Sequence, residues 1–190
     1  MAKRGHSSHT HRERITPNTR SSTRTHQEHK EHAPHRVSCM VITCSDTRTS
    51  ATDTSGQLIM RLLKDQGHEV VAYHLVKDDP VSIKALLETG AGNDAVQAII
   101  INGGTGISKR DSTFETVSAL LDKRLDGFGE LFRYLSYKDI GSSAIMSRAT
   151  AGVYRGRIIL STPGSESAVR LAMEKLILPE LGHMVREITK

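Results

Sequence analysis

Segments of helical periodicity alternate with short runs of β-branched residues from residue 37 onward, and this alternation predicts the elements of the fold. Ser55–Gln66 carries its apolar side chains in one helical stripe, and Asp53 or Thr54 can cap its start. Val81–Thr89 predicts a second helix. Strands are expected at three apolar runs, Val37–Cys44, Glu69–Val76 and Ala98–Ile101. Right-handed crossovers in this order predict a three-layer α/β/α fold with a mostly parallel sheet.

The pattern is less regular after residue 112. Thr113–Lys123 predicts a helix, the glycines of Asp126–Glu130 predict a break, and Leu131–Tyr137 predicts that the helix resumes. Ala144–Arg148 and Arg157–Thr162 predict two further strands. A final long helix is expected where Val169, Ala172, Met173 and Leu176 form an apolar stripe.

Residues 1–35 show neither pattern and are predicted to form a disordered tail before a domain over 36–190. Their apolar residues are Met1, Ala2, Ile15 and Ala33, too few to offset the entropy of ordering. Residues 1–36 carry the whole net charge of +5, and seven of the ten histidines fall in the tail. Such a tail is usually solvated rather than a specific metal site. It has no Phe, Tyr or Trp side chain for base stacking, so no specific nucleic-acid partner is expected.

The two cysteines and the lack of long apolar runs indicate a cytoplasmic protein. Cys39 and Cys44 lie five apart on one predicted strand, so they face opposite sides and are poorly placed to bridge. They are expected to be small core residues in a reducing compartment. No run approaches 18 apolar residues and no apolar segment follows the start, so neither a membrane span nor a secretory signal is expected.

The segment Ile99–Asp111 contains the clearest candidate chemistry. Its unbroken apolar strand ends at Asn102 and leads into Gly-Gly-Thr-Gly at residues 103–106. This turn exposes backbone N–H groups, and Lys109, Arg110 and Asp111 follow it. Cations for phosphate oxygens and a carboxylate for a metal are what phosphoryl or nucleotidyl transfer requires. The alternative is a structural turn whose glycines only supply positive φ. The added charges favour a ligand site.

Further polar residues follow the other predicted strands. Ser45 and Asp46 follow the first strand and Asp78 the second. Pro163-Gly164-Ser165 joins them if its strand runs the same way. Because the carboxyl ends of parallel strands share one edge, these groups are expected to converge. Asp46 could equally hold its own loop, and Asp79 is expected to cap the helix that begins at Pro80.

Several spaced motifs from residue 36 to the C-terminus resemble the MoaB/Mog family of molybdenum cofactor biosynthesis proteins, and its MoaB branch in particular. The matching segments are S-D-T-R-T (45–49), D-T-S-G (53–56), G-G-T-G-x-x-x-R-D (103–111), G-F-G-E (127–130), S-R-A-x-A-G (147–152) and P-G-S (163–165). The resemblance implies a nucleotidyltransferase that adenylylates molybdopterin with MgATP, releases pyrophosphate and prepares molybdate or tungstate insertion. It also implies a trimer or hexamer that hands its product to a metal-insertion protein.

The resemblance assigns roles to particular residues. Asp78 and Asp111 match the family's two important carboxylates and are expected to be catalytic and to hold Mg²⁺. The match places the phosphate-cradling loop at Gly103, Gly104, Thr105 and Gly106. Retention of Arg110 and Asp111 favours an active enzyme over a non-catalytic molybdopterin- or nucleotide-binding scaffold of the same pathway. Further candidates for substrate contact are Ser45, Asp46, Arg110, Glu130, Ser147, Arg148, Pro163, Gly164 and Ser165. Glu130 could instead be a solvated turn residue, and Arg148 could instead pair with a surface acid.

Overall fold

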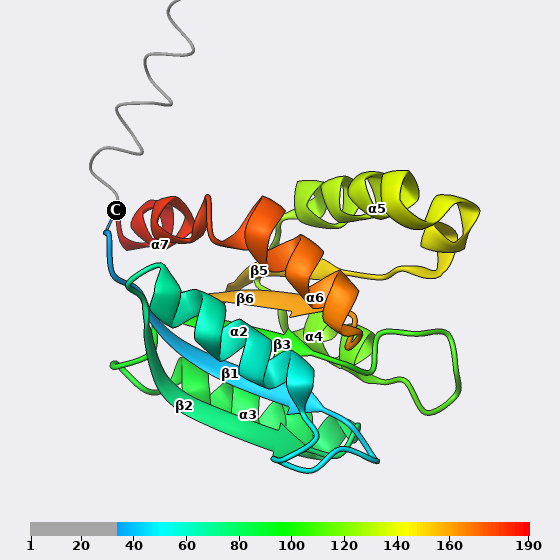
Figure 1. Ribbon diagram of the computed structural model, residues 1–190. Coiled ribbons are helices and arrows are strands. Elements are labelled where there is room, and N and C mark those ends of the chain that lie inside the picture. Colours follow the sequence, from blue (N-terminus) through cyan, green and yellow to red (C-terminus); the bar gives the residue numbers. More distant parts are fainter. Residues whose placement is uncertain (1–33) are drawn as a thin grey trace, which may run out of the picture. The chain divides into compact units, whose positions relative to one another are not determined.

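A six-stranded sheet forms the centre of the domain (Figure 1). The computed structural model describes residues 34–190, so the predicted disorder of the tail and its histidines up to His32 lie outside the described residues. The strand order is β2-β1-β3-β6-β5-β4; β2, β1, β3 and β6 run parallel, and β5 pairs antiparallel with β6 and β4. The strands are β1 (Ser38–Cys44), β2 (Glu69–Val76), β3 (Ala98–Asn102), β4 (Lys123–Arg124), β5 (Thr150–Tyr154) and β6 (Arg157–Thr162).

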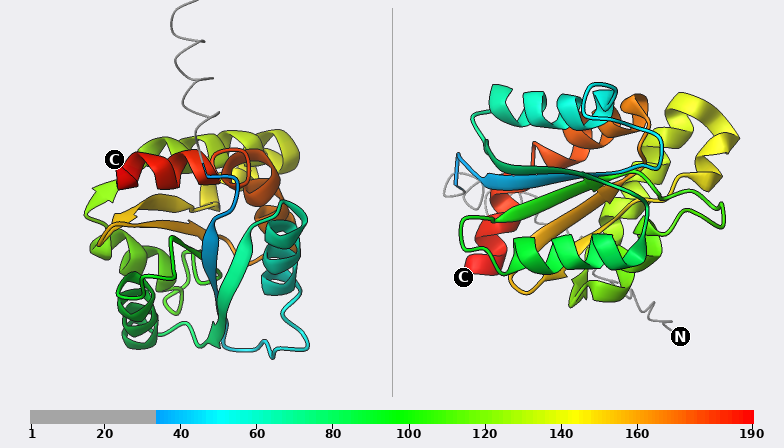
Figure 2. Two further views of the ribbon diagram at one scale, coloured as in Figure 1. Left: turned by 90° about the vertical axis from the view of Figure 1, so that its left-hand side faces the viewer. Right: turned by 90° about the horizontal axis from the view of Figure 1, so that it is seen from below.

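Helices cover both faces of this sheet, which confirms the three-layer α/β/α prediction (Figures 1 and 2). Helices α2, α5, α6 and α7 lie on one face, and α3 and α4 lie on the other (Figure 1). The helical elements are α2 (Thr54–Asp65), α3 (Pro80–Ala91), α4 (Thr113–Leu120), α5 (Asp126–Ile140), the 3₁₀ helix η1 (Gly141–Met146), α6 (Glu166–Ala172), the π-helical turn η2 (Met173–Ile177) and α7 (Leu181–Thr189).

The alternation of side chains along β1 separates two hydrophobic cores. Cys39 and Val41 belong to the core under α2, α5, α6 and α7, whereas Ile42 and Cys44 belong to the core under α3 and α4. Both cysteines are free and buried, as predicted from their spacing. Burial raises the pKa of each thiol to about 12, because the thiolate would lose its hydration.

The early elements follow the sequence pattern closely. Asp53 accepts a hydrogen bond from the N–H of Gly56 and caps α2. Gly67, with φ +79°, provides the left-handed residue after this helix. Asp79 caps α3 through the N–H of Ser82, as expected of an acid before Pro80.

The region between residues 113 and 154 departs from the prediction. Helix α4 ends at Leu120. The interruption between the two helices therefore lies before Asp126 and not at the glycines, which lie within α5. The segment predicted as the strand Ala144–Arg148 is mostly the 3₁₀ helix η1. The strand β5 at Thr150–Tyr154 was not predicted. These corrections change the antiparallel end of the sheet and the helices beside it, but not the parallel half of the sheet.

The parallel pairing of β3 and β6 places the turn at Pro163 on the same sheet edge as the loops after β1, β2 and β3. This confirms the expected convergence of the strand ends. None of the helices within residues 34–190 is both long enough and apolar enough to cross a membrane.

Candidate functional site

A cavity of about 500 Å³ lies at the carboxyl edge of the parallel strands, where the loops after β1, β2, β3 and β6 meet. Its volume is within the usual range for a small-molecule site. It is lined by Cys44, Ser45, Asp46, Thr47, Arg48, Asp78, Gly103, Gly104, Thr105, Gly106, Arg110, Asp111, Met146, Ser147, Pro163 and Gly164.

The floor of the cavity is the glycine loop, and two of its positions require glycine. Gly103 (φ +102°) and Gly104 (φ +57°) have backbone conformations that L-residues rarely adopt. A Cβ on Gly103 would collide with the carbonyl of Cys44, and one on Gly104 would collide with the Asp78 carboxylate. The loop backbone therefore lies directly against the end of β1 and against Asp78.

Asp78 is held by the start of α4. Its Oδ1 accepts hydrogen bonds from the N–H of Ser112 (3.2 Å), from the Ser112 hydroxyl (2.7 Å) and from the Thr113 hydroxyl (3.1 Å). Its Oδ2 faces Gly104 of the loop. One carboxylate oxygen is thus fixed by the protein, and the other is directed at the floor of the cavity.

Asp111 and Arg110 lie at the far end of the same loop. The Asp111 Oδ2 accepts a hydrogen bond from the N–H of Ser108 (3.0 Å) and lies against Gly106. Arg110 pairs with Asp46 at 2.7 Å, which links the loop after β3 to the loop after β1. The Arg110 side chain is 76% exposed, so solvent screens this ion pair and the guanidinium can exchange partners.

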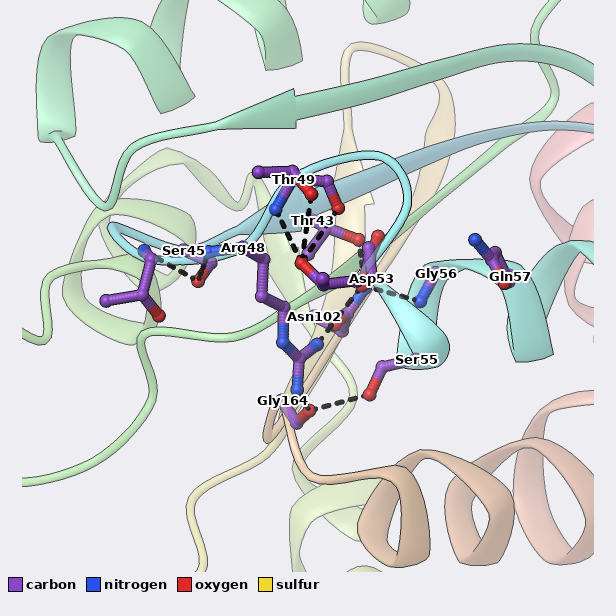
Figure 3. A network of polar contacts seen from close by, with 12 residues as sticks. Thr43, Ser45, Arg48, Thr49, Asp53, Ser55, Gly56, Gln57, Asn102 and Gly164 are labelled. Atoms are coloured by element: carbon purple, nitrogen blue, oxygen red, sulfur yellow. Dashed lines mark hydrogen bonds and ion pairs between the residues drawn. The ribbon is translucent and has the colours of Figure 1, made fainter.

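A buried network holds the loop after β1 against the turn after β6 (Figure 3). Asp53, which is 0% exposed, accepts hydrogen bonds from Arg48 Nη1 (3.1 Å) and the Tyr73 hydroxyl (2.6 Å). Arg48 Nη2 and the Ser55 hydroxyl both donate to the carbonyl of Gly164, each at 2.8 Å. Arg48 therefore connects a buried carboxylate to the rim of the cavity.

The network shifts the pKa values of its two acidic groups in opposite directions. Burial alone would raise the pKa of Asp53, but hydrogen bonds from Tyr73, Gly56 and Thr43 and the charge of Arg48 outweigh it and lower that pKa. Burial and the Asp53 hydrogen bond raise the pKa of Tyr73 to about 12. Asp53 therefore stays ionised and Tyr73 stays protonated at neutral pH.

Arg148 lies behind the glycine loop rather than in the cavity. Its Nε donates to the carbonyl of Thr105 at 2.7 Å, and its Nη2 donates to the carbonyl of Gly106. Glu115 pairs with the same guanidinium, and the ring of Phe114 lies 4.6 Å below it. Arg148 thus contacts the loop from outside the cavity.

Most of the residues predicted for the site converge on this cavity. Those that line it are Ser45, Asp46, Asp78, Gly103, Gly104, Thr105, Gly106, Arg110, Asp111, Ser147, Pro163 and Gly164. Ser165 instead caps α6, where its hydroxyl accepts from the N–H of Ala168 at 3.3 Å. Glu130 lies on the exposed surface of α5 and is not among the lining residues.

Four further residues line the cavity although the sequence pattern does not predict them as site residues: Cys44, Thr47, Arg48 and Met146. Arg48 was visible as the arginine of S-D-T-R-T, five residues before a helix-capping aspartate. That spacing alone does not reveal an ion pair, because the intervening loop sets the distance. Within residues 34–190, no group of three or more His, Cys, Asp or Glu side chains could hold a metal unaided.

Comparisons with known proteins agree on one family. A family model described as a probable molybdopterin binding domain matches residues 40–183. The chain is 56% identical over 162 residues to Molybdenum cofactor biosynthesis protein B of Bacillus cereus, covering 85% of this chain and 96% of that protein. It is 54% identical over 165 residues to the protein of the same name from Bacillus subtilis, covering 86% and 97%.

Solved structures show the same similarity. A crystal structure of Molybdenum cofactor biosynthesis protein B matches with a TM-score of 0.80 at 56% identity, covering 83% of this chain and 98% of that one. The tungsten cofactor synthesizing protein MoaB from Pyrococcus furiosus matches with a TM-score of 0.75 at 35% identity, covering 83% of this chain and 100% of that one.

Proposed function

The chain belongs to the molybdopterin-binding domain family of molybdenum cofactor biosynthesis proteins, and from this membership we propose that it adenylylates molybdopterin with MgATP. The observation that carries the proposal is the placement of two carboxylates, Asp78 and Asp111, against the glycine loop of one cavity. Nucleotidyl transfer requires this combination, because several phosphate charges must be brought together and offset.

The donor set fits a magnesium ion that is shared with substrate phosphates. Mg²⁺ is commonly held by one or two carboxylates together with waters and phosphate oxygens rather than by an all-protein cage. Asp78 and Asp111 each use one carboxylate oxygen in the hydrogen bonds described above, which leaves the other for such a role. When bound, the ion would supply charge neutralisation at the α- and β-phosphates of ATP.

In the proposed reaction a terminal phosphate oxygen of molybdopterin forms a bond to the α-phosphorus of ATP. The bond between this phosphorus and the bridging oxygen to the β-phosphate breaks, and pyrophosphate leaves with that electron pair. The N–H of Gly103 donates to the carbonyl of Thr162 (3.1 Å), so the N–H groups of residues 104–106 would hold phosphate oxygens without side-chain clashes. Arg110, at the exposed mouth, would release Asp46 and pair with the leaving pyrophosphate. No side-chain nucleophile is required, so catalysis would rest on positioning and charge.

Asp111→Ala tests this proposal directly. With freshly released molybdopterin, MgATP and wild-type protein, we expect AMP to appear on the pterin. Asp111→Ala should lower turnover by at least about 100-fold, a typical loss for one electrostatic group, while molybdopterin still binds. Asp94→Asn, whose fully exposed carboxylate pairs with Arg157 away from the cavity, should retain wild-type turnover.

A second reading keeps the same cavity but no turnover: a molybdopterin- or nucleotide-binding scaffold of the same pathway. Tight molybdopterin binding by wild type without any adenylylated product would favour this reading. The retention of both Asp78 and Asp111 on the cavity wall supports the enzyme instead.

A further inference from the structure

The guanidinium of Arg148 is almost fully occupied by groups of the protein itself. A guanidinium has five N–H donors. In Arg148 they reach the carbonyls of Thr105 and Gly106 and both carboxylate oxygens of Glu115. The guanidinium also stacks on the ring of Phe114, and this contact fixes the plane of the guanidinium. A phosphate could bind this group directly only by displacing these partners.

The start of α4 holds both sides of the loop at once. Ser112 and Thr113 fix Asp78 on the cavity side, as described above. Phe114 and Glu115, the next two residues, hold Arg148. The hydrogen bond from Arg148 lowers the pKa of Glu115, so the anchor stays ionised. The glycine loop therefore lies between two groups that one helical turn keeps in register.

The contacts with Arg148 determine how the peptides of the loop are oriented. In a trans peptide the C=O and the N–H point in opposite directions, and residues 34–190 contain no cis peptide. Carbonyls of Thr105 and Gly106 that point at Arg148 therefore turn the N–H groups of Gly106 and Ile107 to the opposite side. Gly106 lines the cavity and Arg148 does not, so this opposite side is the ligand side.

We propose that Arg148 is a positioning residue that holds the carbonyls of Thr105 and Gly106, so that the loop presents its N–H groups to an anionic ligand. It acts through the loop and makes no phosphate contact of its own. The identity of that ligand as the phosphates of ATP and molybdopterin rests on the function proposed above, but the holding of the loop does not.

The test compares Arg148→Lys with Arg157→Lys in the ligand-free full chain. Lysine keeps the charge but cannot hold two carbonyls and a carboxylate in one plane. Arg157, the first residue of β6, is a matched control. Its side chain is 21% exposed against 25% for Arg148, and it pairs with one carboxylate, that of Asp94. Hydrogen–deuterium exchange is followed at the two amides that close the loop, those of Gly103 and Thr113, which donate to the carbonyls of Thr162 (3.1 Å) and Gly104 (3.0 Å). Calorimetric binding of MgATP is measured for each protein as well.

We expect Arg148→Lys to speed exchange at Gly103 and Thr113 by about 10-fold or more and to weaken MgATP binding by a similar factor, the change that corresponds to about 1.4 kcal/mol. Arg157→Lys should change neither. Glu115→Gln, which keeps the arginine and weakens its anchor, should move both quantities in the same direction by less. The melting temperature should stay close to that of wild type in all three variants.

Three outcomes would overturn the proposal. Weakened MgATP binding with unchanged exchange would make Arg148 a direct ligand contact. Faster exchange with unchanged binding would show that the loop conformation does not matter for the ligand. Faster exchange throughout the domain would show a general role in stability. Neither measurement requires turnover, so a wild type that makes no adenylylated pterin would overturn the proposed function alone.

Discussion

Asp53 is the residue on which the wall of the cavity depends, although it does not line the cavity. It is fully buried, and Arg48, Tyr73 and the N–H of Gly56 satisfy its charge. Arg48 then reaches the carbonyl of Gly164, so one carboxylate links the start of α2, the edge strand β2 and the turn after β6. Removing a single partner from such a pair leaves a poorly compensated charge.

Asp53→Asn should lower the free energy of unfolding by about 2–4 kcal/mol at pH 7, because asparagine can still cap α2 but cannot balance Arg48. Denaturant unfolding followed by circular dichroism measures this. Asp94→Asn, at a fully exposed carboxylate, should stay within about 0.5 kcal/mol of wild type. Equal losses in the two variants would contradict the role assigned to Asp53.

The stabilities of the wild type and of Asp53→Asn should converge as the pH falls. The folded-state pKa of Asp53 lies below its ordinary value, so its contribution to stability is complete above the unfolded pKa of about 3.9. That contribution is lost as the pH falls through the lower folded-state pKa, where Asp53 becomes protonated. Unfolding curves from pH 7 down to pH 2 should therefore show the wild type approaching Asp53→Asn. A gap that stays constant would contradict this account.

The chemistry-bearing residues themselves were largely predictable, whereas their partners were not. Asp78, Asp111 and the glycine loop could be placed because each follows a strand whose direction the pattern predicts. Arg148 was expected either to contact substrate or to pair with a surface acid, and the structure directs it to backbone carbonyls and to the exposed Glu115. That outcome depends on the position of Glu115, which is 33 residues away in the sequence and carries no local signal.

Helix α5 is the element where the sequence pattern was most misleading. The pattern predicts a helix break at its two glycines, Gly127 and Gly129, yet both lie inside the helix. Gly129 is there because a Cβ would come within 2.6 Å of the carbonyl of Ala149, so α5 packs closely on the chain that leads into β5. Gly152 interrupts the pattern of β5 for a similar reason, since a Cβ there would collide with the carbonyl of Lys123. Close backbone packing between distant segments cannot be inferred from composition.

Alanine at the two α5 glycines should therefore have opposite effects on stability. Gly127→Ala meets no heavy atom within 4 Å and should stabilise the protein by about 0.5–1 kcal/mol through helix propensity. Gly129→Ala should destabilise it by about 1–3 kcal/mol, because the backbone of Ala149 must move. Thermal unfolding of both variants measures this. A gain in stability for Gly129→Ala would show that α5 is not packed as described.

At the scale of the whole molecule, α5 and η1 carry an unusual concentration of exposed apolar side chains. Within residues 34–190, six of the nine exposed large apolar side chains lie on these two elements: Leu131, Tyr134, Tyr137, Ile140, Ile145 and Met146. Three of them, Tyr134, Tyr137 and Ile145, line a groove of about 500 Å³. Contiguous apolar surface of this kind is typical of an interface. The family resemblance implies a trimer or hexamer, so a second copy of the chain is expected to cover this surface, next to the cavity that Met146 also lines.

Ile145→Asp should reduce the size of the assembly in solution, because Ile145 is 85% exposed and lines this groove. Light scattering coupled to size exclusion measures the mass against the 20.9 kDa of one chain, and the family resemblance predicts a trimer or hexamer for wild type. Val81→Asp changes a side chain that is 76% exposed on α3 and should leave the assembly intact. A monomeric wild type would contradict this assignment.

The two cysteines can report separately on the formation of the two hydrophobic cores, since Cys39 faces one core and Cys44 faces the other. These are the only thiols in the chain, and each is unreactive only while its own layer of helices is docked. Brief pulses of alkylating reagent at different times of refolding would therefore measure the protection of each thiol separately. The time at which Cys39 stops being labelled is the time at which α2, α5, α6 and α7 dock on the sheet. The corresponding time for Cys44 reports the docking of α3 and α4. The order in which the two helical layers dock on the sheet can thus be measured by labelling two side chains of a single strand.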